Sequence, residues 1–276
     1  MTTVAAALAA ARAKLPAGET RLLLGHVLQQ SSAWLLGHDD HMLAEDELRV
    51  FASLVARRAG GEPVAYLVGF REFFGREFAV SPAVLIPRPE TELLVEVALA
   101  GVGAGDAKAG APRILDLGTG SGCIAITLAL EIPRAQVTAV DACETALHIA
   151  TRNAEALGAQ LRFLRGDWFS ALDGERFDLI VANPPYIAAA DPHLTTGDLR
   201  HEPPAALSSG ADGLEALRRI ITEAPAHLAR DGQLWLEHGY DQPETVRELL
   251  AAAGLTGIRQ HRDLAGIIRV SGGYFR

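Results

Sequence analysis

The stretch Asp116-Leu117-Gly118-Thr119-Gly120-Ser121-Gly122 decides the fold of this 276-residue chain. It begins at the end of a short apolar run, residues 113–117, that is typical of a buried strand, and it precedes an apolar segment, residues 123–130, that favours a helix. Glycines between a strand and a helix let the backbone pass close to a ligand, because they have no Cβ and adopt positive φ angles. The stretch therefore predicts a ligand-binding turn in an α/β protein.

Strands and helices are expected to alternate from Pro112 onward. The expected strands are 113–117, 137–141, 161–164, 177–182 and 233–237, and the expected helices are 123–130, 144–157, 214–228 and 243–253. This alternation predicts a doubly wound, mostly parallel sheet. Two last runs, 256–260 and 267–270, are expected to pair as an antiparallel edge.

The chain is expected to contain three regions. Residues 1–61 carry alanines and apolar residues at helical spacing, which predicts a small helical N-terminal domain. Residues 62–89 contain short runs broken by glycines, among them Tyr66-Leu67-Val68-Gly69-Phe70, which are interpreted as strands of a β-hairpin linker. Residues 90–276 form the main α/β domain, with a surface loop expected over 101–110.

Composition excludes several classes of protein. Charged residues make up 21% of the chain and no run of 18 apolar residues occurs, so a soluble protein without a membrane partner is expected. The two cysteines, Cys123 and Cys143, have no metal-type spacing, so we expect no metal and a reducing, cytoplasmic location. The net charge of −9 disfavours a protein that grips long nucleic acid by its phosphates.

The glycine-rich stretch favours S-adenosylmethionine over a dinucleotide. A dinucleotide fold uses the spacing Gly-x-Gly-x-x-Gly, whereas the spacing here is Gly-x-Gly-x-Gly. Asp116 lies just upstream and would repel a pyrophosphate, but it suits a cofactor with a positive centre. Asp141 ends the second strand, where a carboxylate accepts hydrogen bonds from ribose hydroxyls. Trp168 follows the third strand, where an adenine would lie. Helix capping by Asp141 and core packing of Trp168 remain open.

A second motif, Asn183-Pro184-Pro185-Tyr186, follows the fourth expected strand, residues 177–182. The Asn183 side-chain oxygen and the Pro184 carbonyl offer two acceptors to one flat –NH₂ group, and Pro184 has no N–H to compete. Tyr186 can stack on the flat face of such a target. Acceptors aligned with the hydrogens of a weakly nucleophilic nitrogen hold it for methyl transfer. The motif therefore predicts methylation of an amide or an amino group.

Several stretches together resemble the HemK/PrmC family, the peptide chain release factor N5-glutamine methyltransferases. Besides the two motifs above, they are Gly61 to Leu67, Leu85-Ile86-Pro87-Arg88-Pro89-Glu90-Thr91-Glu92, Asp167 to Phe169, Asp198 with Glu202-Pro203, Leu236 to Gly239, and Arg262 to Gly266. The resemblance spans nearly the whole chain and is weakest over the first 60 residues. Glu19 and Ile268 depart from residues that are frequent in the family, and neither lies in the clamp.

The resemblance implies a function. It implies a class I S-adenosylmethionine-dependent methyltransferase domain that methylates the glutamine side-chain N5 in the Gly-Gly-Gln loop of class 1 release factors. It also implies a role for each site residue: Gly118, Thr119, Gly120, Ser121 and Gly122 would line the methionine end of the cofactor, Asp141 would hold the ribose, Trp168 would lie by the adenine, and Asn183, Pro184, Pro185 and Tyr186 would clamp the substrate. The helical N-terminal domain would dock the release factor.

Two alternatives are weighed against this reading. An adenine-N6 methyltransferase of DNA or RNA uses the same clamp, because the exocyclic amine of adenine is also a flat –NH₂ group. It should carry a basic recognition domain, and this chain is acidic with about 90 residues after Tyr186. A non-catalytic module that keeps the fold is disfavoured by the intact clamp. The preferred hypothesis is the glutamine methyltransferase, without a nucleic-acid partner.

Overall fold

The structure, a computed structural model, describes residues 2–104 and 110–276. It divides into two compact units, Met1–Phe70 and Arg71–Arg276, each with its own hydrophobic core. The expected linker, residues 62–89, is shared between the units, since its first part belongs to the first unit and its hairpin to the second. Among the described residues, no helix is long and apolar enough to cross a membrane.

The first unit is helical, as expected, apart from one short strand pair. Its helices are α1 (Val4–Ala11), α2 (Ala17–Leu28), α3 (Ser32–Gly37), α4 (Glu45–Ala59) and α5 (Val64–Val68), and its strands are β1 (Thr2–Thr3) and β2 (Met42–Leu43). Side-chain oxygens of Thr3 and Ser31 accept from the amides of Ala6 and Trp34, which caps α1 and α3. The helices pack on a core that includes Leu23, Leu24, Leu35 and Phe51.

The expected strand over Tyr66–Phe70 is wrong, because residues Val64–Val68 form helix α5. Pro63 precedes the helix and Gly69 ends it in the left-handed region, with φ of 84°. A five-residue apolar run does not distinguish a buried helical turn from a strand by its periodicity. The hairpin itself is present, formed by β3 (Phe70–Phe73) and β4 (Arg76–Ala79).

The second unit is built on a sheet of seven strands among the residues described. The strands are β5 (Arg113–Leu117), β6 (Gln136–Asp141), β7 (Arg162–Arg165), β8 (Phe177–Ala182), β9 (Leu228–Glu237), β10 (Thr256–Arg262) and β11 (Ile268–Phe275). Their order is β10-β11-β9-β8-β5-β6-β7. Strands β5 to β9 pair parallel with one another, whereas β11 pairs antiparallel with both β9 and β10. The predicted doubly wound sheet with an antiparallel edge is confirmed.

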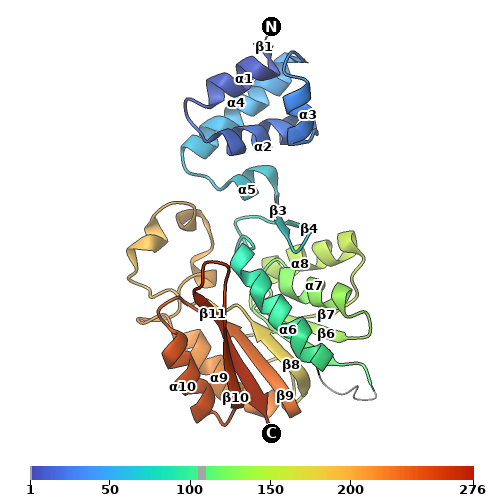
Figure 1. The fold of residues 1–276 in the computed structure, drawn as a ribbon, viewed down its shortest axis with the longest axis vertical. Coiled ribbons are helices and arrows are strands. Elements are labelled where there is room, and N and C mark those ends of the chain that lie inside the picture. Colours follow the sequence, from blue (N-terminus) through green and yellow to red (C-terminus); the bar gives the residue numbers. More distant parts are fainter. Residues whose placement is uncertain (1, 105–109) are drawn as a thin grey trace. The chain divides into compact units, whose positions relative to one another are not determined.

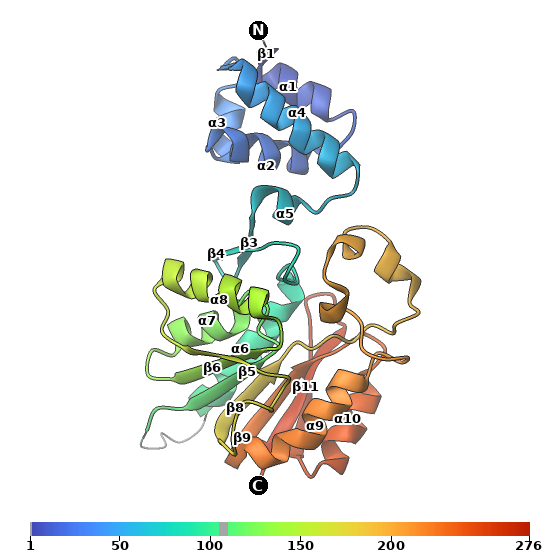
Figure 2. The ribbon, with the colours of Figure 1, turned by 180° about the vertical axis from the view of Figure 1, so that it is seen from behind.

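Helices cover both faces of this sheet (Figures 1 and 2). Helices α6 (Glu92–Ala104), α7 (Cys123–Glu131) and α8 (Glu144–Leu157) share one core with residues such as Ile114, Leu179 and Trp235. Helices α9 (Glu215–His227) and α10 (Pro243–Ala252) share the other core with Leu115 and Ile180. Neighbouring residues of a strand point to opposite faces, so nearly continuous apolar strands serve both cores.

Helix α6 extends at its C-terminus into the region expected to be a loop. The expected loop over residues 101–110 is wrong at its start, because α6 continues through Ala104. Gly101 is packed: its carbonyl accepts from Gln233 Nε2 at 3.1 Å, and a Cβ at Gly101 would lie 2.3 Å from the Gln233 side chain. This contact with β9 holds a glycine inside the helix. Residues 105–109 lie outside the described residues.

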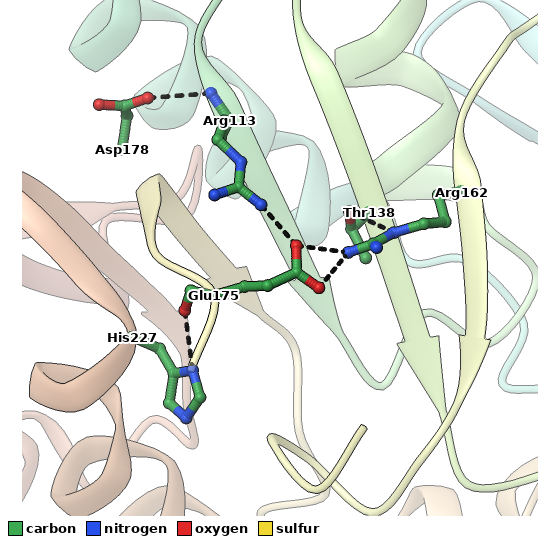
Figure 3. Close-up of polar contacts among 6 residues, drawn as sticks. All are labelled: Arg113, Thr138, Arg162, Glu175, Asp178 and His227. Atoms are coloured by element: carbon green, nitrogen blue, oxygen red, sulfur yellow. Dashed lines mark hydrogen bonds and ion pairs between the residues drawn. The ribbon is translucent and has the colours of Figure 1, made fainter. Parts of the chain in front are cut away.

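Ion pairs hold the edge of the sheet at which the parallel strands begin (Figure 3). Glu175 precedes β8 and binds Arg162 of β7 at 2.8 Å and Arg113 of β5 at 2.5 Å. Asp178 Oδ2 accepts from the Arg113 amide at 2.9 Å, and the His227 ring nitrogen Nδ1 lies 3.0 Å from the Glu175 carbonyl. These pairs lower the pKa of Glu175, chiefly through the hydrogen bonds from Arg162.

Candidate active site

A cavity of about 250 Å³ lies at the carboxyl edge of the sheet, where α/β folds bind their ligands. All its lining residues belong to the second unit. They come from the ends of β5, β6, β7 and β8 with the loops and helix starts that follow them, from the segment that leads into and includes η1 (Pro89–Thr91), and from the segment around η4 (Pro204–Ala206). The cavity brings together residues that lie far apart along the chain. They include Arg88, Thr91, Gly118, Asp141, Trp168, Asn183 and Pro203.

The glycine-rich loop after β5 has the backbone that its sequence predicts. Gly118, Gly120 and Gly122 have φ angles of 73°, 56° and 83°. A side chain at Gly122 would also collide, because a Cβ there would lie 2.7 Å from Ile126 and 3.1 Å from Ala150 of the neighbouring helix. The glycines therefore permit a turn that runs along the cavity and starts α7 close against α8.

Asp141 holds this loop from the next strand. Its Oδ2 accepts from the Gly120 amide at 2.8 Å, and its Oδ1 accepts from the Cys143 amide at 2.8 Å. Burial raises the pKa of Asp141, and these hydrogen bonds oppose the rise. Each carboxylate oxygen has a second acceptor position, so Asp141 can shape the loop and still accept from a ligand hydroxyl. Asp141 does not cap α8, because the N-cap is Cys143 and has no side-chain cap hydrogen bond, and the ribose interpretation stays open.

Asp116 lies beneath the loop and is fully buried. Its Oδ2 accepts from the Thr119 hydroxyl at 2.7 Å, while Oδ1 has no hydrogen-bond partner among the described residues. Burial raises the pKa of Asp116 to about 7, and the hydrogen bond from Thr119 opposes this. Burying a carboxyl that keeps an unused acceptor position costs stability. Such groups are therefore found most often where a function requires them.

Trp168 lines the cavity and is half-buried. Its backbone adopts a φ of 53°, which is uncommon for a bulky residue. A Cβ on Gly118 would lie 3.3 Å from the Trp168 ring, so a glycine at that position lets the ring lie close to the loop. The indole therefore forms a flat wall of the cavity, although Trp168 also packs against the second core.

The Asn183-Pro184-Pro185-Tyr186 motif is divided between the cavity and the core. Asn183 and Pro185 line the cavity, whereas Pro184 is buried and Tyr186 is largely enclosed by the second core. Asn183 Nδ2 donates to the Thr91 hydroxyl at 3.0 Å. The Tyr186 hydroxyl donates to Glu237 Oε1 at 3.2 Å. The stacking of Tyr186 on a substrate stays a prediction.

The segment before α6 contributes cavity residues for which the sequence predicts no catalytic or binding role. In the structure Arg88 and Thr91 line the cavity. Glu202, 3% exposed, accepts from the Ile86 amide at 3.0 Å and pairs with Arg88. These contacts tie the cavity wall before α6 to the loop that carries Pro203. The sequence contains the strings Pro87-Arg88-Pro89 and Glu202-Pro203, but only the folded contact between Arg88 and Glu202 shows that these two segments meet.

Most of the predicted site residues meet at this cavity. Gly118, Thr119, Gly120, Ser121, Asp141, Trp168, Asn183 and Pro185 line it, whereas Gly122, Pro184 and Tyr186 are not among its lining residues. Within the part of the chain that the structure describes, no group of three His, Cys, Asp or Glu residues could hold a metal ion.

Solved structures with this architecture define the class of protein. The chain is similar to the hMettl16 catalytic domain in complex with MAT2A 3'UTR hairpin 6, with 18% identity, a TM-score of 0.58, and 81% of this chain and 82% of that chain covered. It is also similar to the T. thermophilus 16S rRNA N2 G1207 methyltransferase in complex with AdoMet and guanosine, with 21% identity, a TM-score of 0.54, and 75% and 50% covered. The fold is that of the class I S-adenosylmethionine-dependent methyltransferases, as predicted.

Closer relatives define the family. The chain is 54% identical to a release factor glutamine methyltransferase of Bordetella pertussis, over 94% of this chain and 95% of the relative, and 51% identical to one of Burkholderia pseudomallei, over 94% and 92%. Residues 1–69 match the PrmC N-terminal domain, and residues 105–210 match the Methyltransferase small domain. The chain therefore belongs to the release factor glutamine methyltransferase family, which confirms the resemblance seen in its sequence.

The cavity residues fit S-adenosylmethionine. Its ribose hydroxyls need an acceptor and its adenine needs a flat wall, and Asp141 and Trp168, which both line the cavity, have the chemistry to offer them. The glycines of the loop add no side chain to the space, and a positively charged cofactor is favoured near the carboxyl of Asp141, which lines the cavity. The residues present are thus suited to a cationic nucleoside.

Proposed function

We propose that this protein transfers a methyl group from S-adenosylmethionine to the side-chain N5 of the glutamine in the Gly-Gly-Gln motif of class 1 release factors. The observation that carries the proposal is the cavity, which Asn183 and Pro185 line together with the glycine loop and Asp141. Acceptors for a flat amide and a cofactor site therefore share one space. The family membership of the chain supports the choice of substrate.

Each predicted site residue has a proposed role. Gly118 to Gly122 would hold the methionine part of the cofactor, Asp141 the ribose and Trp168 the adenine. Asn183 and the carbonyl of Pro184 would accept both hydrogens of the substrate amide. Tyr186 and Pro185 would complete the clamp around it.

The clamp would make a weakly nucleophilic amide nitrogen more reactive toward a methyl group. When bound, S-adenosylmethionine supplies an electrophilic methyl group: the nitrogen lone pair forms the new N–C bond, the S–C pair stays on sulfur, and the nitrogen gives one proton to water. Two acceptors on the amide hydrogens draw electron density onto nitrogen and fix its lone pair in direction. Pro184, which is buried, would present its carbonyl without an amide hydrogen that competes.

The partner and location are part of the same proposal. The helical unit, which matches the PrmC N-terminal domain, would dock the release factor, and the reaction would take place in the cytoplasm. Hydrogen exchange of residues 4–59 should slow when a class 1 release factor is added. Unchanged exchange in all these helices would remove the docking role while leaving the transfer reaction intact.

A labelled transfer assay tests the central proposal. With radiolabelled S-adenosylmethionine and a class 1 release factor, label is expected on the Gly-Gly-Gln glutamine and is expected to vanish when that glutamine is replaced by alanine. An oligonucleotide that contains adenine serves as the competing substrate, because an adenine-N6 enzyme would use the same acceptors. Label in the oligonucleotide and none in the protein would reverse the assignment.

A further inference from the structure

The side-chain amide of Asn183 is oriented by a residue from outside its own motif. Its Nδ2 donates to the Thr91 hydroxyl at 3.0 Å, across 92 positions of sequence. Thr91 ends η1 and is 2% exposed. The two ends of an amide have nearly the same shape, so the choice between presenting N–H or oxygen to a substrate depends on neighbours. With Nδ2 engaged by Thr91, Oδ1 is left as the acceptor.

The hydroxyl of Thr91 is in turn oriented by a buried carboxyl. Glu237 ends β9 and is 1% exposed. The Tyr186 hydroxyl donates to Oε1 at 3.2 Å, Oε2 has no hydrogen-bond partner among the described residues, and Thr91 lies close enough to the carboxyl to lower the pKa of Glu237. A hydroxyl has one hydrogen to donate. Because Thr91 accepts from Asn183, its own hydrogen is free for Glu237.

A relay in which every hydrogen points toward Glu237 would satisfy all of these groups, including the unpartnered Oε2. An ionised carboxylate only accepts hydrogen bonds, so it fixes the direction of each donor that reaches it. A Thr91 hydroxyl that donates to Glu237 can only accept from Asn183, as it does in the structure, and this turns the Asn183 nitrogen away from the substrate. Tyr186, the last residue of the clamp, is held by the same carboxylate. One acceptor thus orients both ends of the motif.

We propose that Glu237, acting through Thr91 and Tyr186, is the positioning residue that makes Asn183 present its oxygen to the substrate amide. Without this relay Asn183 can turn over and present N–H groups to a substrate that also offers N–H groups. The inference rests on the proposed function, since it assumes an amide substrate. It extends the clamp to the segment before α6, to which the sequence analysis assigned no chemistry.

The relay depends on the charge of Glu237. Burial raises the pKa of Glu237 to about 7, the hydrogen bonds from Thr91 and Tyr186 and the positive charge of Arg269 oppose the rise, and Glu90 adds to it. These groups come from η1, the loop after β8 and β11, which are the elements around the carboxyl. Around neutral pH the carboxylate form should therefore titrate, and with it the fixed direction of the relay.

The first test separates the hydroxyl of Thr91 from its shape. Thr91→Val removes the hydroxyl and keeps the volume, whereas Thr91→Ser keeps the hydroxyl. At saturating S-adenosylmethionine, kcat should fall roughly 10- to 100-fold in Thr91→Val, the scale of one preorganised polar contact acting through a second residue, and should largely recover in Thr91→Ser. Thr127→Val is the matched control, because Thr127 is a fully buried threonine in α7 whose hydroxyl has no partner among the described residues.

The second test measures how kcat depends on the ionisation of Glu237. Wild-type kcat should rise with pH through an apparent pKa near 7, since the carboxylate is the orienting form. Glu237→Gln should lower kcat and lose this rise. Asp116, whose pKa is also about 7, is present in both proteins, so the difference between their profiles isolates Glu237.

A readout without turnover completes the test. The side-chain amide hydrogens of Asn183 should exchange slowly in the wild-type protein and in Thr91→Ser, and quickly in Thr91→Val, as seen by nuclear magnetic resonance. Fast exchange in the wild type, or wild-type kcat in Thr91→Val, overturns the relay while label on the release factor leaves the proposed function standing. Absence of label with the wild type overturns both.

Discussion

The amino-terminal and carboxyl-terminal edges of one sheet both carry carboxyl groups, and their pKa values move in opposite directions. At the amino-terminal edge, Glu175 sits between Arg113 and Arg162, and its pKa is lowered (Figure 3). At the carboxyl-terminal edge, burial raises the pKa of Asp116 and of Glu237 to about 7. The first edge pairs its charges, while the second buries them with fewer partners.

This difference separates what holds the sheet together from what prepares it for a ligand. Paired charges near solvent add modestly to stability, and a network of them adds more than one pair. Buried carboxyls with spare acceptor positions cost stability, which is typical of sites built to receive a substrate. The sheet thus gains stability at the edge remote from the cavity and loses some of it at the edge that forms the cavity.

The largest expected effect is loss of transfer when the clamp is removed. Asn183→Ala should lower kcat/KM by roughly 10²- to 10³-fold, or about 2–4 kcal/mol of transition-state stabilisation, because one preorganised acceptor is lost. Methyl transfer to a release factor measures it, with Glu175→Gln at the opposite edge as the control that retains activity. Wild-type-like kcat/KM in Asn183→Ala would refute the clamp.

Next comes a gain of stability at the carboxyl-terminal edge. Glu237 has a pKa of about 7 when folded against an ordinary value of 4.5, so the folded state binds the proton more tightly and loses stability as pH rises through this window. Glu237→Gln should therefore unfold with about 3 kcal/mol more free energy than the wild type at pH 8, and with little difference at pH 5. Urea unfolding at the two pH values measures this. An equal difference at both would contradict the titration.

A smaller effect is expected on cofactor affinity. Asp141→Ala removes a charged acceptor, so S-adenosylmethionine should bind roughly 10- to 100-fold more weakly by calorimetry, on the order of 1.5–3 kcal/mol. Asp141→Asn keeps one acceptor oxygen and should fall between. If affinity is unchanged, Asp141 serves the Gly120 and Cys143 amides alone.

The smallest effect is expected at the amino-terminal edge. Glu175→Gln should lower the free energy of unfolding by about 1 kcal/mol, since the pairs are partly exposed, and should leave kcat unchanged. A carboxyl with a lowered pKa stabilises the fold above its ordinary pKa and loses that contribution on acidification, so the difference should fade near pH 3. A change in kcat without a change in stability would break the division between the edges.

The sequence by itself determined the strands of the sheet and the motifs that follow them at the ligand-binding edge. The apolar runs of β5, β6 and β8 and the glycines and prolines after β5 and β8 are local signals, because they act through backbone freedom and through burial of neighbouring residues. Gly118, Asp141, Trp168 and Asn183 were predicted from such signals and meet at the cavity.

Only the tertiary structure decided how that site is supported. The run Val64–Val68 became a helix because its flanks and its core neighbours outweighed its β-like composition. The bonds from Asn183 to Thr91 and from Tyr186 to Glu237 join residues 92 and 51 positions apart, and the pair of Arg88 with Glu202 spans 114. Periodicity and motif spacing carry no information on such pairs, because the contacts exist only after the sheet has brought distant segments to one edge.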